Sequence, residues 1–119
     1  MAKHLEIGKK GEEIASAYLL SKGYQILQRN YRFKHMEIDI IAKDEDELVI
    51  VEVKTRQNSY LAGPEDTVTR SKQKLIIKAA NEFIVANAVD LETRFDIISV
   101  LVSQNQNHVN HIKSAFYPT

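Results

Sequence analysis

The chain has 119 residues, of which 44% are hydrophobic and 27% charged, a composition typical of a globular protein with one domain over residues 1–119. It contains no cysteine, which excludes disulfides, thiolate zinc sites and cysteine nucleophiles. The formal net charge is zero, which argues against indiscriminate electrostatic binding to nucleic acid or to acidic membranes.

The N-terminal residues MAKHLEIGKKGEE include several bases, but the apolar stretch of a secretory signal does not follow them. No uncharged apolar run has the length needed to cross a bilayer. We therefore expect a soluble cytoplasmic protein without a membrane partner.

The first predicted element is a helix over about residues 6–22, where apolar and small residues recur at helical spacing before Gly23. A strand is predicted within GYQILQRNYR, and HMEIDIIA follows as the next strand after a short connection. The second strand alternates, so we expect Met36, Ile38 and Ile40 on one face and Glu37, Asp39 and Ile41 on the other.

The acidic turn KDEDE leads straight into the apolar strand LVIVEVKTR, which predicts an antiparallel hairpin. After a looser stretch with Gly63 and Pro64, a helix is predicted over residues 68–87, with Leu75 in its apolar stripe. RFDIISVLV and a weaker segment over residues 108–113 are the last predicted strands. The order αβββαββ indicates an α/β fold, a mixed sheet of about five strands covered by helices.

The strand LVIVEVKTR carries Glu52 and Lys54 on one face, although its other residues are mostly apolar. A buried charge is costly unless it is paired, bound to a metal or neutralised. If the turn is centred between Glu45 and Asp46, Asp39 lies opposite Glu52, and Glu37 lies opposite Lys54.

Two carboxylates this close require a proton or a cation between them. Ligands that are all oxygen favour Mg²⁺ or Mn²⁺ over zinc. Lys54 would then hold an attacking water or stabilise charge on a phosphoryl oxygen, an arrangement suited to phosphodiester hydrolysis. The alternative from spacing alone is an ordinary ion pair between Glu52 and Lys54 on an exposed face.

An acidic residue on one strand followed by E-x-K on the next resembles the core motif of the restriction-endonuclease-like PD-(D/E)xK superfamily. More closely, the segments GKKGEEIASAYLLSKGYQILQRNYR, EIDIIA, VEVKTR, SKQKL and RFDIISV resemble the YraN-like family. That family comprises small bacterial proteins of uncharacterised function that are considered similar to archaeal Holliday-junction resolvases. The resemblance covers nearly the whole chain and implies a restriction-endonuclease-like fold.

The resemblance also implies roles for individual residues. Asp39 and Glu52 match the metal-binding acids, with the backbone carbonyl of Val53 as a further ligand, and Lys54 matches the catalytic lysine. Glu12 matches an acidic residue of the first helix that supports the site in resolvase-like proteins; the alternative is a solvated helix glutamate. Resolvase relatives act as dimers, so a homodimer is implied by analogy.

Several basic residues are candidates for contacts with nucleic-acid phosphates. Arg56 shares the face of Lys54, and Arg70, Lys72 and Lys74 lie near the start of the second helix. In the alternative interpretation Lys72 extends from the edge of the core. His108 and His111 are expected at the surface and not as ligands.

The sequence therefore predicts a magnesium- or manganese-dependent endonuclease that acts on DNA, including branched DNA. The rival hypothesis is a nucleic-acid-binding or scaffolding protein that keeps the nuclease-like fold without its chemistry. Nothing in the sequence distinguishes DNA from RNA as the partner.

Overall fold

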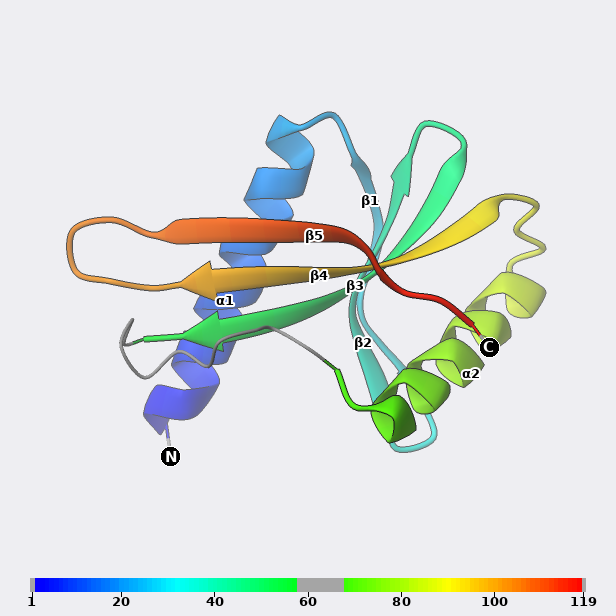
Figure 1. Ribbon diagram of the computed structural model, residues 1–119, viewed down its shortest axis with the longest axis horizontal. Coiled ribbons are helices and arrows are strands. Elements are labelled where there is room, and N and C mark those ends of the chain that lie inside the picture. The colour runs from blue at the N-terminus through cyan, green and yellow to red at the C-terminus, as the bar shows by residue number, and fades with distance from the viewer. Residues whose placement is uncertain (1, 58–67, 119) are drawn as a thin grey trace.

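The computed structural model describes the backbone of residues 2–57 and 68–118, and side chains from Glu6 onward; Gly63 and Pro64 lie outside these ranges. The element order αβββαββ is the predicted one (Figure 1). The helices and strands are α1 (Ala2–Ser21), β1 (Gln25–Phe33), β2 (Met36–Asp44), β3 (Glu47–Arg56), α2 (Arg70–Ala86), β4 (Glu92–Leu101) and β5 (His108–Phe116). Neither described helix is both long and apolar enough to cross a membrane.

The strands form one mixed sheet in the order β1-β2-β3-β4-β5. The central pair, β3 and β4, is parallel, and all other neighbours are antiparallel. Between β2 and β3, Asp44 pairs with Glu47 across a two-residue turn, and Ile40 pairs with Val51. This register is the predicted one, because a two-residue hairpin turn fixes which residues face each other.

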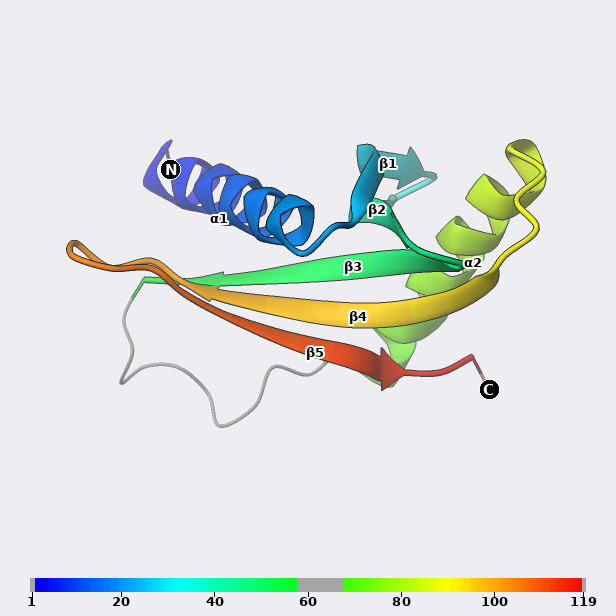
Figure 2. The same ribbon diagram turned by 90° about the horizontal axis from the view of Figure 1, so that it is seen from above.

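Successive residues of the central strands point to opposite faces of the sheet and belong to two separate apolar clusters. Leu48 and Ile50 of β3 pack with Ile76 and Phe83 of α2 in one cluster. Val49 and Val51 pack with α1 in the other cluster, which includes Ala15 and Leu19. Figure 2 shows α1 lying along one side of β3, β4 and β5. The two helices therefore cover different faces.

The β1–β2 hairpin changes face part-way along its length. Ile40 packs in the α1 cluster, whereas Ile38 packs in the α2 cluster, so the prediction that they share a face is wrong. Asn30 has a φ of 53° between the pairs Arg29–Ile40 and Tyr31–Ile38. A left-handed residue breaks the regular alternation of side chains, and asparagine tolerates this conformation well.

The second helix begins later than predicted, at Arg70, because Thr69 caps it by accepting a hydrogen bond from the backbone N–H of Lys72 at 3.2 Å. Its buried residues are Ile76, Ala79, Ala80 and Phe83. Leu75 is 52% exposed, so its predicted place in the apolar stripe is wrong.

Candidate functional site

The close approach of α1 to β3 shows which side chains of the strand face the helix and which face away from it. Gly11 of α1 lies so close to Thr55 that a Cβ at Gly11 would overlap with the threonine side chain. Since Thr55 faces α1, Glu52 and Lys54 face away from it, as the alternation predicted. Glu52 is only 8% exposed, and Lys54 is half-buried.

Asp39 lies where β2 separates from β3. The ladder between these strands ends at the pair Ile40–Val51, so the predicted pairs Asp39–Glu52 and Glu37–Lys54 are not part of it. Beyond it, the Oδ2 atom of Asp39 accepts a hydrogen bond from the backbone N–H of Val53 at 2.7 Å. A strand residue directs its N–H and C=O toward the same neighbour, so the carbonyl of Val53 also faces this opening.

Three carboxylates act on one another at this opening. Burial and the charges of Glu52 and Glu12 together raise the pKa of Asp39 to about 7, against the lowering effects of the Val53 N–H and of Lys72. Glu12 reaches the opening from α1 and is held by the β1 edge. Its Oε1 accepts a hydrogen bond from Asn30 Nδ2 at 2.9 Å and lies 3.9 Å from Arg29 NH2.

Glu52 is paired with a lysine of α2, not with Lys54. The Nζ atom of Lys72 donates to Oε2 of Glu52 at 2.6 Å. This contact joins residues that lie 20 positions apart, and neither predicted role of Lys72, at a phosphate or at the edge of the core, included it. Arg70 and Lys74, predicted with it as phosphate contacts, are exposed on the first turns of α2.

The remaining predicted residues, Lys54 and Arg56, continue along β3. Their register partners on β4 are Ser99 and Leu101, and both side chains are half-buried. The Arg56 carbonyl accepts a hydrogen bond from the backbone N–H of Val102 at 2.7 Å, which holds the end of the strand to β4. The structure therefore brings Glu12, Asp39, Glu52 and Lys72 together, with Lys54 next to Glu52 on the same face.

The donor set fits a hydrated divalent cation more closely than a cage made of protein ligands. Among the described residues, no group of three histidines, cysteines, aspartates or glutamates is arranged to hold a metal ion. Magnesium, however, commonly uses one or two carboxylates and keeps several waters. Burial is the main cause of the raised pKa of Asp39, with Glu52 second, so an ionised Asp39 would be stabilised by a cation in addition to Lys72. Asp39, Glu52 and the Val53 carbonyl are the groups that could hold such an ion.

A second polar cluster lies between α1, β4 and β5. Asp96 is fully buried, and its Oδ1 accepts hydrogen bonds from Arg94 Nε at 2.9 Å and from the Ser114 N–H at 3.0 Å. Its Oδ2 lies 2.7 Å from Nε2 of His111. Burial would raise the pKa of Asp96, but the hydrogen bonds from His111, Arg94 and Ser114 outweigh it and hold the pKa below its usual value.

The expectation that His111 lies at the surface is wrong. Its side chain is 5% exposed, and its Nδ1 atom lies 3.2 Å from the hydroxyl of Tyr18 on α1. The sequence did carry a signal for this contact. Asp96 stands among apolar residues in RFDIISV, and a buried carboxylate requires partners from elsewhere in the fold.

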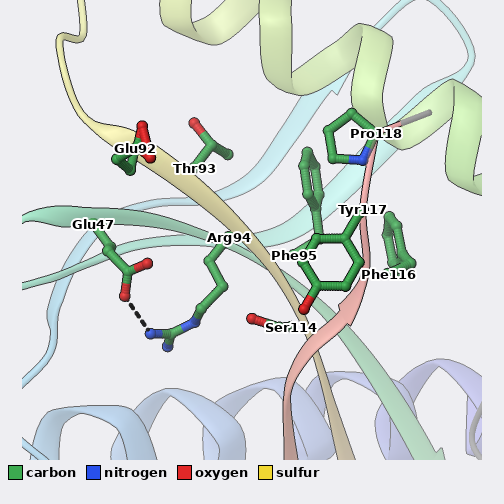
Figure 3. Close-up of a pocket in the computed structure, with 9 residues that line it drawn as sticks. All are labelled: Glu47, Glu92, Thr93, Arg94, Phe95, Ser114, Phe116, Tyr117 and Pro118. Carbon is green, nitrogen blue, oxygen red and sulfur yellow. Dashed lines mark hydrogen bonds and ion pairs between the residues drawn. The ribbon is translucent and has the colours of Figure 1, made fainter.

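Arg94 also borders a cavity of about 270 Å³, which Figure 3 shows in close-up with Ser114 and Tyr117. Its NH1 donates to Glu47 at 2.8 Å, and its NH2 donates to the Tyr24 hydroxyl at 2.7 Å. The guanidinium is thus already occupied by Asp96, Glu47 and Tyr24. We assign this cluster to structure, since it joins β3, β4 and β5 to one another and, through Tyr18, to α1.

Comparison with known proteins gives the family. Residues 11–100 match the model of the uncharacterised protein family UPF0102. A UPF0102 protein of Flavobacterium psychrophilum is 46% identical over 98% of both chains. One from Bacteroides thetaiotaomicron is 48% identical over 99% of this chain and 98% of its own. The resemblance to a family of uncharacterised bacterial proteins is therefore confirmed, and the chain belongs to the UPF0102 family.

Proposed function

We propose that the chain is a magnesium- or manganese-dependent endonuclease that hydrolyses phosphodiester bonds in DNA, including branched DNA. The observation that carries this proposal is the shared position of Asp39 and Glu52 at the opening between β2 and β3, where burial and Glu52 raise the pKa of Asp39 to about 7. Perturbed carboxylates that share a site are typical of functional centres. The αβββαββ order supports a restriction-endonuclease-like fold as part of the proposal.

In this proposal each side chain of the opening has a separate task. Asp39, Glu52 and the Val53 carbonyl bind the ion, which supplies charge stabilisation at the phosphoryl group when bound. Lys54 orients the attacking water or stabilises charge on a phosphoryl oxygen. Glu12 positions the site from α1 through its contacts with Asn30 and Arg29. Phosphates along the nucleic-acid strand contact four basic side chains, which are Arg56, Arg70, Lys72 and Lys74.

The test is a cleavage panel with Mn²⁺ over single-stranded, duplex, flap and four-way-junction DNA, with a matching RNA strand. Wild-type protein should cut at least one DNA substrate, and Asp39→Asn or Glu52→Gln should abolish the cleavage. Asp46→Asn is the matched control, because Asp46 is exposed in the β2–β3 turn and should cut like the wild type. Cleavage that survives both site substitutions would come from a contaminating enzyme and would contradict the proposal.

A second candidate function is a nucleic-acid-binding or scaffolding protein that performs no hydrolysis. The ion pair between Lys72 and Glu52 favours it, because a lysine already neutralises one of the two carboxylates at 2.6 Å. Calorimetric titration with Mn²⁺ separates the two functions. Binding heat that disappears in Asp39→Asn supports the nuclease, whereas no heat with the wild type supports the binding protein.

A further inference from the structure

An apolar groove lies beside the candidate site, between the β1–β2 turn and α2. Its volume is about 180 Å³, and the residues that line it are Phe33, Lys34, His35, Met36, Leu75 and Lys78. Figure 1 shows this turn, in cyan, beside the first half of α2. We call this feature the hairpin groove.

The floor of the hairpin groove is formed by opposed residues of a tight turn. Phe33 pairs directly with Met36, so their side chains lie next to each other on one side of the ribbon. Lys34, in the turn, has a φ of 57°, and its ammonium lies 5.4 Å from the centre of the Phe33 ring. Leu75 closes the groove from α2 and is 52% exposed. The floor is therefore fixed by the hairpin and open to solvent.

The two charged side chains that line the groove, Lys34 and Lys78, are both positive. Lys34, His35 and Lys78 are exposed at its rim, and no carboxylate is found among the described residues that line it. The chain as a whole has a net charge of zero, so this combination of an apolar floor and a basic rim is local. It complements a ligand with an apolar ring face attached to a phosphate chain.

Two elements, β2 and α2, connect the hairpin groove with the candidate site over a short distance. Met36 lies three residues before Asp39 on β2, about 10 Å along the strand. Leu75 lies one helical turn after Lys72, about 4.5 Å along α2, and Lys72 contacts Glu52. A nucleic acid whose phosphate reached Asp39 and Glu52 would therefore pass the groove within a few nucleotides.

We propose that the hairpin groove binds one unpaired nucleobase of the DNA at the candidate site; this inference rests on the nucleic-acid substrate of the proposed function. A base inside a duplex is stacked and presents only its edges, whereas an unpaired base can present its face to apolar and aromatic side chains. The floor of Phe33, Met36 and Leu75 offers that contact, and Lys34 and Lys78 neutralise the adjoining phosphates. The groove therefore selects for DNA with unpaired bases, such as those at bulges and in single-stranded flaps.

The test measures binding in EDTA, so that no cleavage occurs, with three duplexes that differ at one position. One has an unpaired 2-aminopurine, one has a base-free sugar at the same bulge, and one is fully paired. The wild type should bind the 2-aminopurine bulge about fivefold more tightly than the other two, with a change in 2-aminopurine fluorescence. Leu75→Gln should remove the preference and leave affinity for paired DNA unchanged.

Leu20→Gln is the matched control, because Leu20 lies on α1 and is 58% exposed, comparable with Leu75. It should keep the preference, and both variants should melt like the wild type. Equal affinity for the three duplexes, or a preference that survives Leu75→Gln, would overturn the inference. Base preference without cleavage in Mn²⁺ would support the groove and contradict only the hydrolysis. If no duplex binds at all, both proposals fail and the groove is left for a protein partner.

Discussion

Asp39 and Asp96 occupy similar positions in the backbone but different electrostatic surroundings. Each carboxylate accepts a backbone N–H where a strand ladder is interrupted, from Val53 in one case and Ser114 in the other. Asp96 is compensated by Arg94 and His111, and its pKa is lowered. Asp39 has Glu52 and Glu12 nearby, and its pKa is raised. Burial is the largest cause of this raised pKa, so an ionised Asp39 needs more compensation than Lys72 supplies, a property that is typical of functional sites.

Asp39→Asn should stabilise the metal-free protein above pH 7. Between pH 4 and pH 7 the folded state holds a proton that the unfolded state releases, so stability falls as pH rises through this window. With a pKa of about 7 against 3.8 for the unfolded group, the loss above pH 7 is at most about 4 kcal/mol. Asparagine keeps an oxygen for the Val53 N–H and removes the charge.

Urea unfolding of wild type and Asp39→Asn at pH 8 and pH 4.5, both in EDTA, measures this effect. The variant should be more stable at pH 8, and the difference should shrink at pH 4.5. Asp46→Asn serves as the control and should show neither change, since Asp46 is exposed. A variant that is less stable than the wild type at pH 8 would contradict the raised pKa.

Asp96→Asn should destabilise the protein, the opposite of the effect expected for Asp39→Asn. Its lowered pKa gives stability that is present above the unfolded value near 4 and is lost as pH falls through the folded pKa. The substitution leaves Arg94 buried without its main counter-charge, which costs about 3–5 kcal/mol near neutral pH. Chemical denaturation at pH 7 should show a lower midpoint with an unchanged m-value. Arg94 NH1 also lies 3.3 Å from Oδ2 of Asp44, so an unchanged midpoint would mean that Glu47 and Asp44 alone compensate Arg94.

At the scale of elements, α1 is positioned by one close approach. Gly11 leaves room for Thr55, whereas a Cβ at Gly8 would meet nothing within 4 Å. Gly8→Ala should therefore stabilise the protein by up to about 1 kcal/mol through helix propensity. Gly11→Ala gains the same propensity but must displace Thr55, so it should destabilise by about 1–3 kcal/mol.

Thermal unfolding gives the melting temperatures of the two variants, in which the same glycine-to-alanine change is made three residues apart on α1. Gly11→Ala should also weaken Mn²⁺ binding if α1 carries Glu12 to the site as proposed, and Gly8→Ala should not. Equal melting temperatures for both variants would show that Thr55 can move away at no cost.

The elements were predictable because their signals are local. The β2–β3 turn fixed the register as far as Ile40–Val51, and Asp39 and Glu52 lie close to each other just beyond the end of that ladder. The contacts of Glu52 with Lys72 and of Asp96 with His111 were not predictable, because each joins elements that only the tertiary fold brings together. The change of face on β2 lies opposite Asn30 of β1, whose positive φ the alternation of apolar residues does not encode.

At the scale of the whole molecule, the two apolar clusters share their central strands. Residues of β3 and β4 alternate between the α1 cluster and the α2 cluster, so both faces of this pair are buried. The edge positions belong to β1 and β5, which have a neighbouring strand on one side only. The candidate site lies where β2 leaves β3, at the boundary between this buried centre and the hairpin.

Hydrogen exchange should reproduce this arrangement. Amides of Val49–Val51 and of Ile97–Ile98 are buried on both faces and should exchange only through global unfolding, hence most slowly. The Val53 amide, which donates to the Asp39 side chain beyond the end of the ladder, should exchange faster than that of Val51. Asp96→Asn should speed exchange of the slow group uniformly, because it lowers global stability, whereas Asp39→Asn should slow the same group at pH 8, because it raises global stability there. If β5 or α1 holds the slowest amides instead, the shared centre of β3 and β4 is not the most stable part of the fold.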